Sequence, residues 1–463
     1  MNNHNKQKYA LIIGLGKSGM AAVRYLHAKG FQLAVTDAGD TNHFSKDDLE
    51  ILVQLEVDLE FGGHTNRFLR DNCLVVPSPG VPLQLPLIEE ARRRGCTIAG
   101  ELALAGSELH IPTICITGTN GKTTVTSLIG ELLRADGKKI FVGGNIGTPI
   151  LEYLLAPENI EVAVFELSSF QLENMGSFHP HIAVLLNITP DHIDRHGSLE
   201  NYVSAKQNIF ANQNQNDFAI IGSDDHELLK LIENSPATCL RFGYSENIHA
   251  SIKGTNIIIT TEVDNSQEVE IYCLSNTNLL SGVNKLNAAA GILAAKTFGC
   301  SSDNIRQGLA NFNPPAHRMS LVREHKGVHW INDSKATNLG AVNAALTGCE
   351  KPVILIAGGR AKDNDFEMLI PIVSKKVKKL LLIGEASLAM EKTLGPIVST
   401  ELMDDLESAV HRAAHLALPG NIVLLAPGCA SFDMFRNYEE RGEIFCKTVL
   451  ALPEQNNLEQ IAS

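Results

Sequence analysis

Residues 116–124 read Ile-Thr-Gly-Thr-Asn-Gly-Lys-Thr-Thr, and this stretch decides how the chain is folded. A β-rich run at 111–115 precedes it, and an apolar-periodic segment at 125–133 follows it. A strand, a glycine loop and a helix that begins with Lys-Thr form a cradle for phosphates, because the loop amides and the helix N-terminus face the anion. In such a loop the lysine reaches the terminal phosphates and the adjacent hydroxyl ligates Mg²⁺. The stretch therefore predicts a nucleotide-phosphate site within an α/β domain.

The loop departs from the general phosphate-loop pattern at one position. That pattern has a glycine five residues before Gly121, where this chain has Ile116. An ordinary strand-to-helix turn is the alternative interpretation, but Gly-Lys-Thr lies in the strand–loop–helix context that the motif requires. We expect the loop to contact the nucleotide through Gly118, Thr119, Asn120, Gly121, Lys122, Thr123 and Thr124.

Length, charge and cysteine usage limit the class of protein. A chain of 463 residues is too long for one core and suggests about three domains. The formal net charge of −13 disfavours nucleic acid as a partner. The sequence contains no run of 18 or more apolar residues, so it does not predict a membrane span. The polar N-terminus does not resemble a signal peptide. Nine scattered cysteines without a Cys-x-x-Cys pair favour reduced thiols, so we expect a cytoplasmic protein.

Strands alternate with helices in three successive blocks, which predicts an α/β protein with parallel sheets and helical crossovers. We expect a Rossmann-like N-terminal domain at 1–103, a central P-loop ATPase-like domain at 104–314 and a Rossmann-like C-terminal domain at 315–463. The central domain contains short alternating runs at 250–272 that predict a small β-meander. The predicted strands are 9–13, 31–36, 73–76, 162–165, 182–187, 329–332, 353–357, 380–383 and 422–425.

The first block carries the pattern Gly14-x-Gly16-x-x-Gly19, with Asp37 placed to reach a ribose. Alone, this pattern suggests an NAD-dependent oxidoreductase, although the same turn serves any diphosphate at a helix N-terminus. The second phosphate loop in another block favours an enzyme that joins a nucleotide-linked substrate to ATP chemistry. A nucleotide-binding regulator without turnover is the third alternative.

Two titratable groups follow strands of the central block. Glu166 ends the strand at 162–165, so it should lie beside the phosphate loop, where a carboxylate can hold Mg²⁺. An exposed loop glutamate is the alternative. His192 lies in a polar cluster at 187–196, where it is either a metal or substrate contact or a structural histidine. By helical spacing alone, Lys206 is a solvated surface lysine.

Three loops of the last block each follow a strand end, at 332–338, 358–363 and 427–433. Because the carboxyl ends of parallel strands meet at one edge of a sheet, the loops should gather there. They would offer lysines, hydroxyls and amides to an anion. Three unrelated surface turns are the alternative.

These blocks, in this order, resemble the Mur ligase family over essentially the whole chain, and within it the members that add D-glutamate. The most specific segments are the loop at 118–124, Glu-Leu-Ser-Ser-Phe-Gln at 166–171 and Asn-Asp-Ser-Lys-Ala-Thr-Asn at 332–338. The segments at 14–19 and 78–82 favour these members over ligases that add other amino acids. Folylpolyglutamate synthetase shares the ATP loop and is less similar at both ends.

The resemblance implies an ATP-dependent amide ligase of peptidoglycan precursor synthesis. The substrates would be UDP-N-acetylmuramoyl-L-alanine and D-glutamate, joined through an acyl phosphate with release of ADP and phosphate. The first domain would hold the UDP moiety, the second would hold ATP with two Mg²⁺ ions, and the third would close over the site. The expected enzyme is a monomer.

The resemblance also implies residue roles. The catalytic residues would be Lys122, Glu166, His192 and Lys206. The metal ligands would be Thr123, Glu166, His192 and Lys206, the last as a carbamate formed with CO₂. Further ATP contacts would be Asn284, Asn287, Arg318, Asp333 and Lys335. The UDP-substrate contacts would be Gly14, Leu15, Gly16, Lys17, Ser18, Asp37, Ser78, Pro79, Gly80, Asn145 and Ser168. D-Glutamate would meet Thr337, Lys362, Ser431 and Phe432.

The chain departs from the family pattern at two places. The family commonly has a histidine before its Asn-x-x-Asn segment, whereas Val283 precedes Asn284 here. After Asp37 this chain has Ala38 and Gly39, where relatives often carry bulkier polar residues. The adenine contact of that histidine and the packing around uracil therefore do not carry over.

Overall fold

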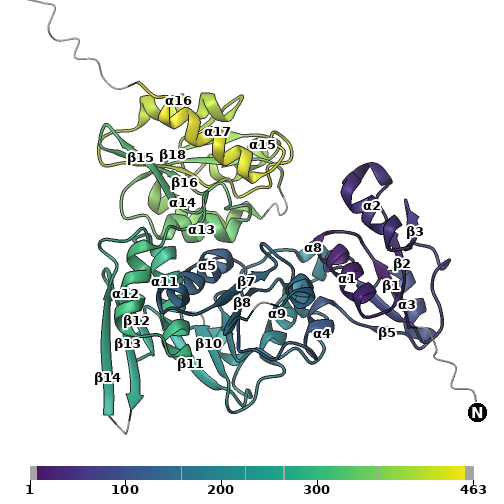
Figure 1. The fold of residues 1–463 in the computed structure, drawn as a ribbon. Helices are drawn as coiled ribbons and strands as arrows, with labels where there is room; N and C mark the ends of the chain where they lie inside the picture. The colour runs from purple at the N-terminus through teal and green to yellow at the C-terminus, as the bar shows by residue number, and fades with distance from the viewer. Residues whose placement is uncertain (1–7, 158, 225, 264–265, 362–364, 454–463) are drawn as a thin grey trace, which may run out of the picture.

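The computed structural model describes residues 8–157, 159–224, 226–263, 266–361 and 365–453, and it contains three sheets. Each sheet is built from a separate part of the chain, and we refer to these parts as the first, middle and third domains. Figure 1 shows the first and third domains on different sides of the middle one. The expected α/β class with largely parallel sheets is confirmed, whereas the expected boundaries at 103 and 314 stay predictions.

The first domain has a parallel sheet with the order β3-β2-β1-β4-β5. All five residues of its central strand β1 are buried, as the apolar run predicts. The strands β3 and β5 were not expected, because β3 is a charged, partly exposed edge strand and β5 has only two residues. The elements are β1 (Tyr9–Ile13), α1 (Lys17–Ala28), β2 (Gln32–Asp37), α2 (Lys46–Gln54), β3 (Asp58–Phe61), β4 (Leu74–Pro77), α3 (Pro86–Arg93) and β5 (Thr97–Ile98).

The middle domain has a nine-stranded sheet with the order β14-β13-β12-β11-β10-β9-β6-β8-β7. The expected meander is present, and it extends this sheet because β12 pairs in parallel with β11 before β13 and β14 turn antiparallel. The strands are β6 (Thr113–Thr117), β7 (Ile140–Gly144), β8 (Val162–Glu166), β9 (Ile182–Leu185), β10 (Phe218–Gly222), β11 (Thr238–Gly243), β12 (Ala250–Lys253), β13 (Asn256–Val263) and β14 (Ser266–Cys273).

The helices of the middle domain cover the sheet and contact both neighbouring domains. α5 packs against α11 and α12, whereas α6 packs against α1 of the first domain and α13 of the third domain packs against α11. None of the helices described is both long and apolar enough to cross a membrane. The helices are α4 (Glu101–Ala105), α5 (Lys122–Ala135), α6 (Ile150–Leu155), α7 (Ser169–Leu172), α8 (Ile193–His196), α9 (Leu199–Gln207), α10 (His226–Lys230), α11 (Gly282–Phe298) and α12 (Ser302–Asn311).

The third domain has a six-stranded sheet with the order β15-β16-β20-β17-β18-β19, and β15 is its antiparallel edge strand. β20 lies between β16 and β17, so the loops after these three strands emerge side by side. The elements are β15 (Ser320–His325), β16 (Val328–Asn332), α13 (Leu339–Thr347), β17 (Val353–Gly358), α14 (Ile370–Lys376), β18 (Val377–Ile383), α15 (Ser387–Leu394), β19 (Thr400–Leu402), α16 (Leu406–Leu416), β20 (Ile422–Leu425) and α17 (Tyr438–Leu450).

The strands at the centre of the middle sheet are buried and support the site described below. Substitutions of two isoleucines in this domain test this burial. Ile220 in β10 is fully buried, whereas Ile271 in the edge strand β14 is 53% exposed. Ile220→Ala should lower the free energy of local opening by about 2–5 kcal/mol, because it removes buried methyl groups and leaves a cavity. Hydrogen exchange of the β9 and β10 amides measures this opening.

The matched control is Ile271→Ala, which should change the same quantity by no more than about 0.5 kcal/mol. Equal losses of protection in the two variants would contradict the burial of β10 at the centre of the sheet.

Candidate active site

The phosphate loop connects the end of β6 to the first residue of α5. Gly121 has φ +88°, and a Cβ built on it would lie 2.5 Å from the side-chain oxygen of Asn287. Glycine is therefore required there for both backbone conformation and space. The loop also has a partner that the sequence did not single out: Asn187, just beyond β9. The amides of Thr119 and Asn120 donate to Asn187 O and Oδ1, each at 2.9 Å. The loop is thus held in shape by the neighbouring strand end.

Two lysines converge on one carbonyl of this loop. Lys122 Nζ donates to Gly118 O and to Thr119 O, each at 2.8 Å, and Lys206 Nζ donates to Gly118 O at 2.8 Å. Lys206 is only 1% exposed, so the surface position expected from helical spacing is wrong. Burial, together with the charge of Lys122, holds the pKa of Lys206 well below its ordinary value. The surroundings of Lys206 therefore disfavour its charged form relative to a lysine in water.

A chain of hydrogen bonds leads from the third domain through the loop to Asn145, which lines a cavity between the first and middle domains. Arg318 Nη2 donates to Thr123 Oγ1 at 2.7 Å, and Thr123 Oγ1 donates to Glu166 Oε2 at 2.7 Å. Asn145 Nδ2 donates to the other carboxylate oxygen of Glu166 at 2.8 Å. Glu166 is 2% exposed, so the alternative of an exposed loop glutamate is wrong.

The Thr123 hydroxyl and the Glu166 carboxylate are oxygen ligands of the kind that Mg²⁺ prefers. Among the residues described, no three His, Cys, Asp or Glu side chains are grouped so that they could hold a metal. A magnesium ion here would therefore complete its shell with phosphate oxygens and water, as is usual for this ion.

His192 directly precedes α8 and has a left-handed backbone, φ +56°. Its ring lies edge-on to Phe170, with 5.0 Å between the centroids, and Nε2 lies 3.8 Å from Asp191 Oδ2. Asn338 Nδ2 of the third domain donates to the same Asp191 oxygen at 3.0 Å. His192, Asp191 and Asn338 line a cavity of about 200 Å³, whose described lining does not include Thr123 or Glu166. The predicted metal role of His192 stays a prediction.

A second cavity, of about 60 Å³, lies between the phosphate loop, α11 and the third domain. Many of the expected nucleotide contacts meet there, and Val283 also stands in the wall. The predicted residues that line it are Asn120, Gly121, Thr124, Asn284, Asn287, Arg318, Asp333 and Lys335.

Two charged side chains of this cavity are strongly affected by burial. Asp333 is enclosed and accepts the Met319 amide at 3.1 Å, and its burial raises the pKa of the carboxyl to about 7. Lys335 lies with Nζ 3.8 Å from the centroid of the Tyr438 ring. Burial and the nearby Arg318 lower the pKa of Lys335 to about 8. Both groups are poised to respond to an anionic ligand.

A third cavity, of about 360 Å³, lies between the first and middle domains. Asp37 helps to shape it, because its two oxygens accept the amides of Leu15 at 2.6 Å and Gly39 at 2.7 Å. Gln171 lines it and was not predicted, whereas Ser168 is not in its described lining and instead caps α7. The predicted residues that line it are Gly14, Leu15, Gly16, Lys17, Ser18, Asp37, Ser78, Pro79, Gly80 and Asn145.

The three loops of the third domain gather as expected, so the alternative of unrelated turns is wrong. The amide of Gly428 donates to Ala336 O at 2.8 Å, and Arg360 and Ala430 exchange backbone bonds of 2.9 Å. Ser431 is buried, Thr337 is half-buried, and Phe432 is 65% exposed. The predicted contact Lys362 lies outside the described residues. The contacts of Thr337, Ser431 and Phe432 with an amino acid stay predictions.

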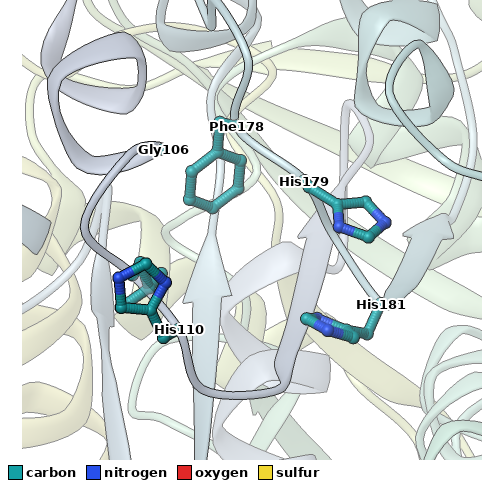
Figure 2. A pocket seen from close by; sticks show the side chains of 6 residues that line it. Gly106, His110, Phe178, His179 and His181 are labelled. Carbon is teal, nitrogen blue, oxygen red and sulfur yellow. The ribbon is translucent and has the colours of Figure 1, made fainter.

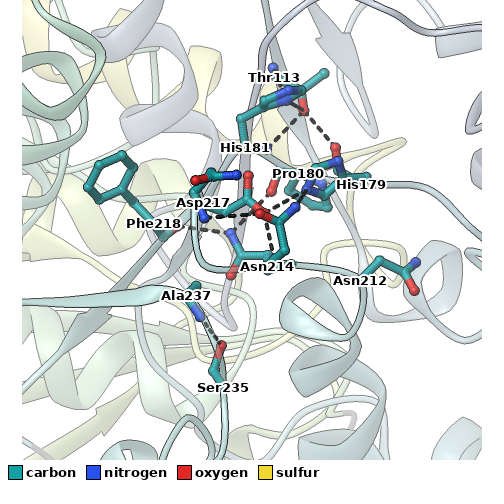
Figure 3. Close-up of polar contacts among 12 residues, drawn as sticks. Thr113, His179, Pro180, His181, Asn212, Asn214, Asp217, Phe218, Ser235 and Ala237 are labelled. Atoms are coloured by element: carbon teal, nitrogen blue, oxygen red, sulfur yellow. Dashed lines mark hydrogen bonds and ion pairs between the residues drawn. The ribbon is translucent and has the colours of Figure 1, made fainter.

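A cavity of about 300 Å³ at the opposite edge of the middle sheet is lined by three histidines. Figure 2 shows His110 on one side of it and His179 and His181 on the other. His179 Nε2 pairs with Asp217 at 2.7 Å, and the Thr113 amide donates to His181 Nδ1 at 3.2 Å (Figure 3). A neutral His181 therefore carries its proton on Nε2, which leaves that nitrogen without a lone pair for a metal. These contacts brace the starts of β6, β9 and β10, at the edge of the sheet opposite the phosphate loop.

Sequence profiles of three Mur ligase domains match consecutive parts of the chain. The N-terminal domain of MurD-like Mur ligases matches residues 8–100, and the Mur ligase middle domain matches residues 116–295. The glutamate ligase domain of Mur ligases matches residues 317–429. The order of the matches follows the order of the three sheets.

Two relatives align with nearly the whole chain. The UDP-N-acetylmuramoylalanine--D-glutamate ligase of Desulfotalea psychrophila is 44% identical over 443 residues, which cover 96% of this chain and 96% of that protein. The enzyme of the same name from Syntrophus aciditrophicus is 40% identical over 446 residues, which cover 95% of this chain and 97% of that protein.

Solved structures of lower identity share the fold. A pseudomurein peptide ligase type C from Methanothermus fervidus has a TM-score of 0.58 at 19% identity, with 95% of this chain and 99% of that chain covered. UDP-N-acetylmuramate-alanine ligase from Thermotoga maritima has a TM-score of 0.56 at 18% identity, with 95% and 98% covered. The family resemblance inferred from the motifs is thus confirmed, and the chain belongs to the Mur ligase family.

Proposed function

We propose that this protein is an ATP-dependent ligase that joins D-glutamate to UDP-N-acetylmuramoyl-L-alanine in peptidoglycan precursor synthesis. The names of its relatives at 44% and 40% identity support this choice of substrates. The hydrogen-bonded chain Asn145–Glu166–Thr123 is the observation that carries the proposal. It connects the cavity of the first domain to the phosphate loop, so that a carboxylate held in that cavity lies within reach of ATP.

The reaction needs activation because a carboxylate resists attack by an amine. The alanyl carboxylate of the substrate attacks the γ-phosphorus of ATP, the bond to ADP breaks, and an acyl phosphate forms. The amine of D-glutamate then attacks the acyl carbon, phosphate leaves, and the amine gives up a proton. The protein contributes position and charge, as is usual in phosphoryl transfer. Lys122 neutralises the phosphates, and Mg²⁺, held by Thr123 and Glu166, would supply further charge stabilisation.

We further propose that Lys206 is carbamylated in the active enzyme. Carbamylation forms a bond between Nζ and the carbon of CO₂ and releases a proton, which requires a neutral amine. Lys206 is 1% exposed and lies beside Lys122, two conditions that favour the neutral form. The product is an anion among cations, able to bind Mg²⁺ beside the transferred phosphate.

We also propose a cytoplasmic monomer. The described structure includes all nine cysteines as free thiols, including Cys73 and Cys96 with sulfurs 3.5 Å apart. Free thiols at this distance are the state expected in a reducing compartment.

The substrate assignment is tested with a panel of amino acids. With UDP-N-acetylmuramoyl-L-alanine and ATP present, D-glutamate should trigger ADP release and other amino acids should not. Lys122→Ala should abolish ADP release and retain binding of the UDP substrate, because the two cavities are separate. Hydride transfer with NAD, or a preference for another amino acid, would contradict the assignment.

Lys206→Ala should lower the rate of ADP release by about 100-fold or more, since it removes a charged group beside the transferred phosphate. Added formate or acetate should partly restore the rate by supplying the missing carboxylate. Lys230→Ala is the matched control, because Lys230 is an exposed lysine of the same domain. Full activity in the Lys206 variant would exclude a carbamate at this position.

Asp333 predicts a pH dependence of stability in the ligand-free protein. Its pKa of about 7 exceeds the ordinary 3.8, so between these values the folded state binds more protons than the unfolded state. The contribution of this group to stability therefore falls as the pH rises from about 4 to 7. Asp333→Asn should remove that loss, and its advantage over the wild type should grow with pH, to about 4 kcal/mol at most.

Urea unfolding followed by the fluorescence of Trp330 measures this effect, because the only tryptophan of the chain is buried in β16, the strand that Asp333 directly follows. Asp404→Asn, at an exposed position of the same domain, is the control. A difference between Asp333→Asn and wild type that does not change with pH would show that Asp333 is ionised throughout.

A further inference from the structure

One buried carboxylate lies outside the machinery described so far. Glu101 is the first residue of α4, between the first and middle domains, and is 4% exposed. Its Oε2 accepts the Ser18 hydroxyl at 2.8 Å and the Gln171 amide at 3.4 Å, and its Oε1 accepts the backbone amide of Ile150 at 2.8 Å. Burial raises the pKa of Glu101, and these hydrogen bonds oppose the rise.

We call the cavity of about 360 Å³ between the first and middle domains the UDP-substrate cavity. Each partner of Glu101 lines this cavity or directly follows a residue that lines it. Ser18 lines the cavity from α1, and Gln171 lines it from α7. Ile150 directly follows Pro149, which lines the cavity from the middle domain. Glu101 itself is not in the described lining of this cavity, so it contacts the lining residues on the side that faces away from the cavity.

The bond to Gln171 reaches a further predicted contact. Gln171 turns its amide NH₂ toward Glu101, and its Oε1 accepts the backbone amide of Ser168 at 3.0 Å. Glu101 and Ser168 together therefore fix which way the Gln171 amide points, and this connects Glu101 to Ser168. A buried carboxylate tolerates little displacement of its donors, because each lost bond leaves a desolvated charge.

We infer that Glu101 is a positioning residue for the UDP-linked substrate, which joins Ser18, Ile150 and Gln171 across the boundary between the first and middle domains. This rests on the proposed function of the cavity. By fixing the two walls relative to each other, Glu101 sets the affinity for the UDP-linked substrate and leaves the ATP site unaffected.

The chain offers a matched control at the same boundary. Arg24 of α1 pairs with Glu152 of α6 at 2.6 Å, so this pair also joins the first and middle domains. Glu152 is 24% exposed, and neither member lines the cavity in its described extent. Glu152→Gln therefore removes the ionic part of this contact between the domains without altering the wall.

The experiment measures KM for UDP-N-acetylmuramoyl-L-alanine and for ATP in D-glutamate-dependent ADP release. Glu101→Ala should raise KM for the UDP substrate by about tenfold or more, the effect of losing hydrogen bonds to a charged group. The KM for ATP should stay within about twofold, because the phosphate loop makes none of these contacts. Glu152→Gln should leave both values unchanged.

Glu101→Gln provides a second variant that keeps most of the packing. Its oxygen still accepts the Ile150 amide, and the Ser18 hydroxyl can turn to accept from its NH₂, but the Gln171 amide then faces another donor. Its KM for the UDP substrate should lie between those of the wild type and Glu101→Ala. Thermal unfolding of each variant checks that the protein is folded.

An unchanged KM for the UDP substrate in both Glu101 variants would overturn the inference. So would an equal rise in KM for both substrates, or the same rise in Glu152→Gln, since either result indicates a general structural role. These outcomes differ from failure of the proposed function, in which the wild type itself shows no D-glutamate-dependent ADP release and the inference falls with it.

Discussion

The parallel pairing of β6 with β8 on one side and β9 on the other is the constraint on which the rest of the structure depends. It places the phosphate loop between two strand ends, one carrying Glu166 and the other leading to Asn187. Asn187 accepts hydrogen bonds from two backbone amides of the loop, and Glu166 accepts one from the hydroxyl of Thr123. The loops that follow parallel strands lie at the same edge of a sheet. This one backbone arrangement therefore brings together Asn187, the phosphate loop and the Glu166 carboxylate.

The electrostatics of the site follow from burial and not from overall charge. The chain carries a formal charge of −13 and yet collects Lys122, Lys206, Lys335 and Arg318 around the phosphate loop and the nucleotide cavity. Close cations repel one another and lose hydration, which lowers the pKa values of Lys206 and Lys335. An anionic nucleotide would relieve both costs for Lys122, Lys335 and Arg318, because burial also strengthens the attraction of these cations to phosphate.

Much of this arrangement could be predicted from the sequence, because local patterns encode it. Continuous apolar runs marked the central strands, and polar residues at their ends marked the loops that meet at the sheet edges. The sequence pattern did not reveal β3 and β5, since a charged edge strand and a two-residue strand lack such a run. Lys206 looked like a surface residue because its burial depends on β6, far away in the chain, and only the family resemblance singled it out. Glu101 escaped notice for the same reason, and the contact of Asn187 with the phosphate loop was not predicted although this residue begins the predicted polar cluster at 187–196.

The contacts between domains at the site are few, short and polar. Arg318 reaches Thr123 from the third domain, Asn338 reaches Asp191, and Ser18 reaches Glu101 from the first. Packing of α1 on α6, within one apolar cluster, and of α13 on α11 also holds the domains together, but apolar packing is not directional. Buried hydrogen bonds are directional and lose their value over small displacements. The packing therefore holds the domains together. The buried polar contacts determine the relative position in which the cavities and the phosphate loop face one another.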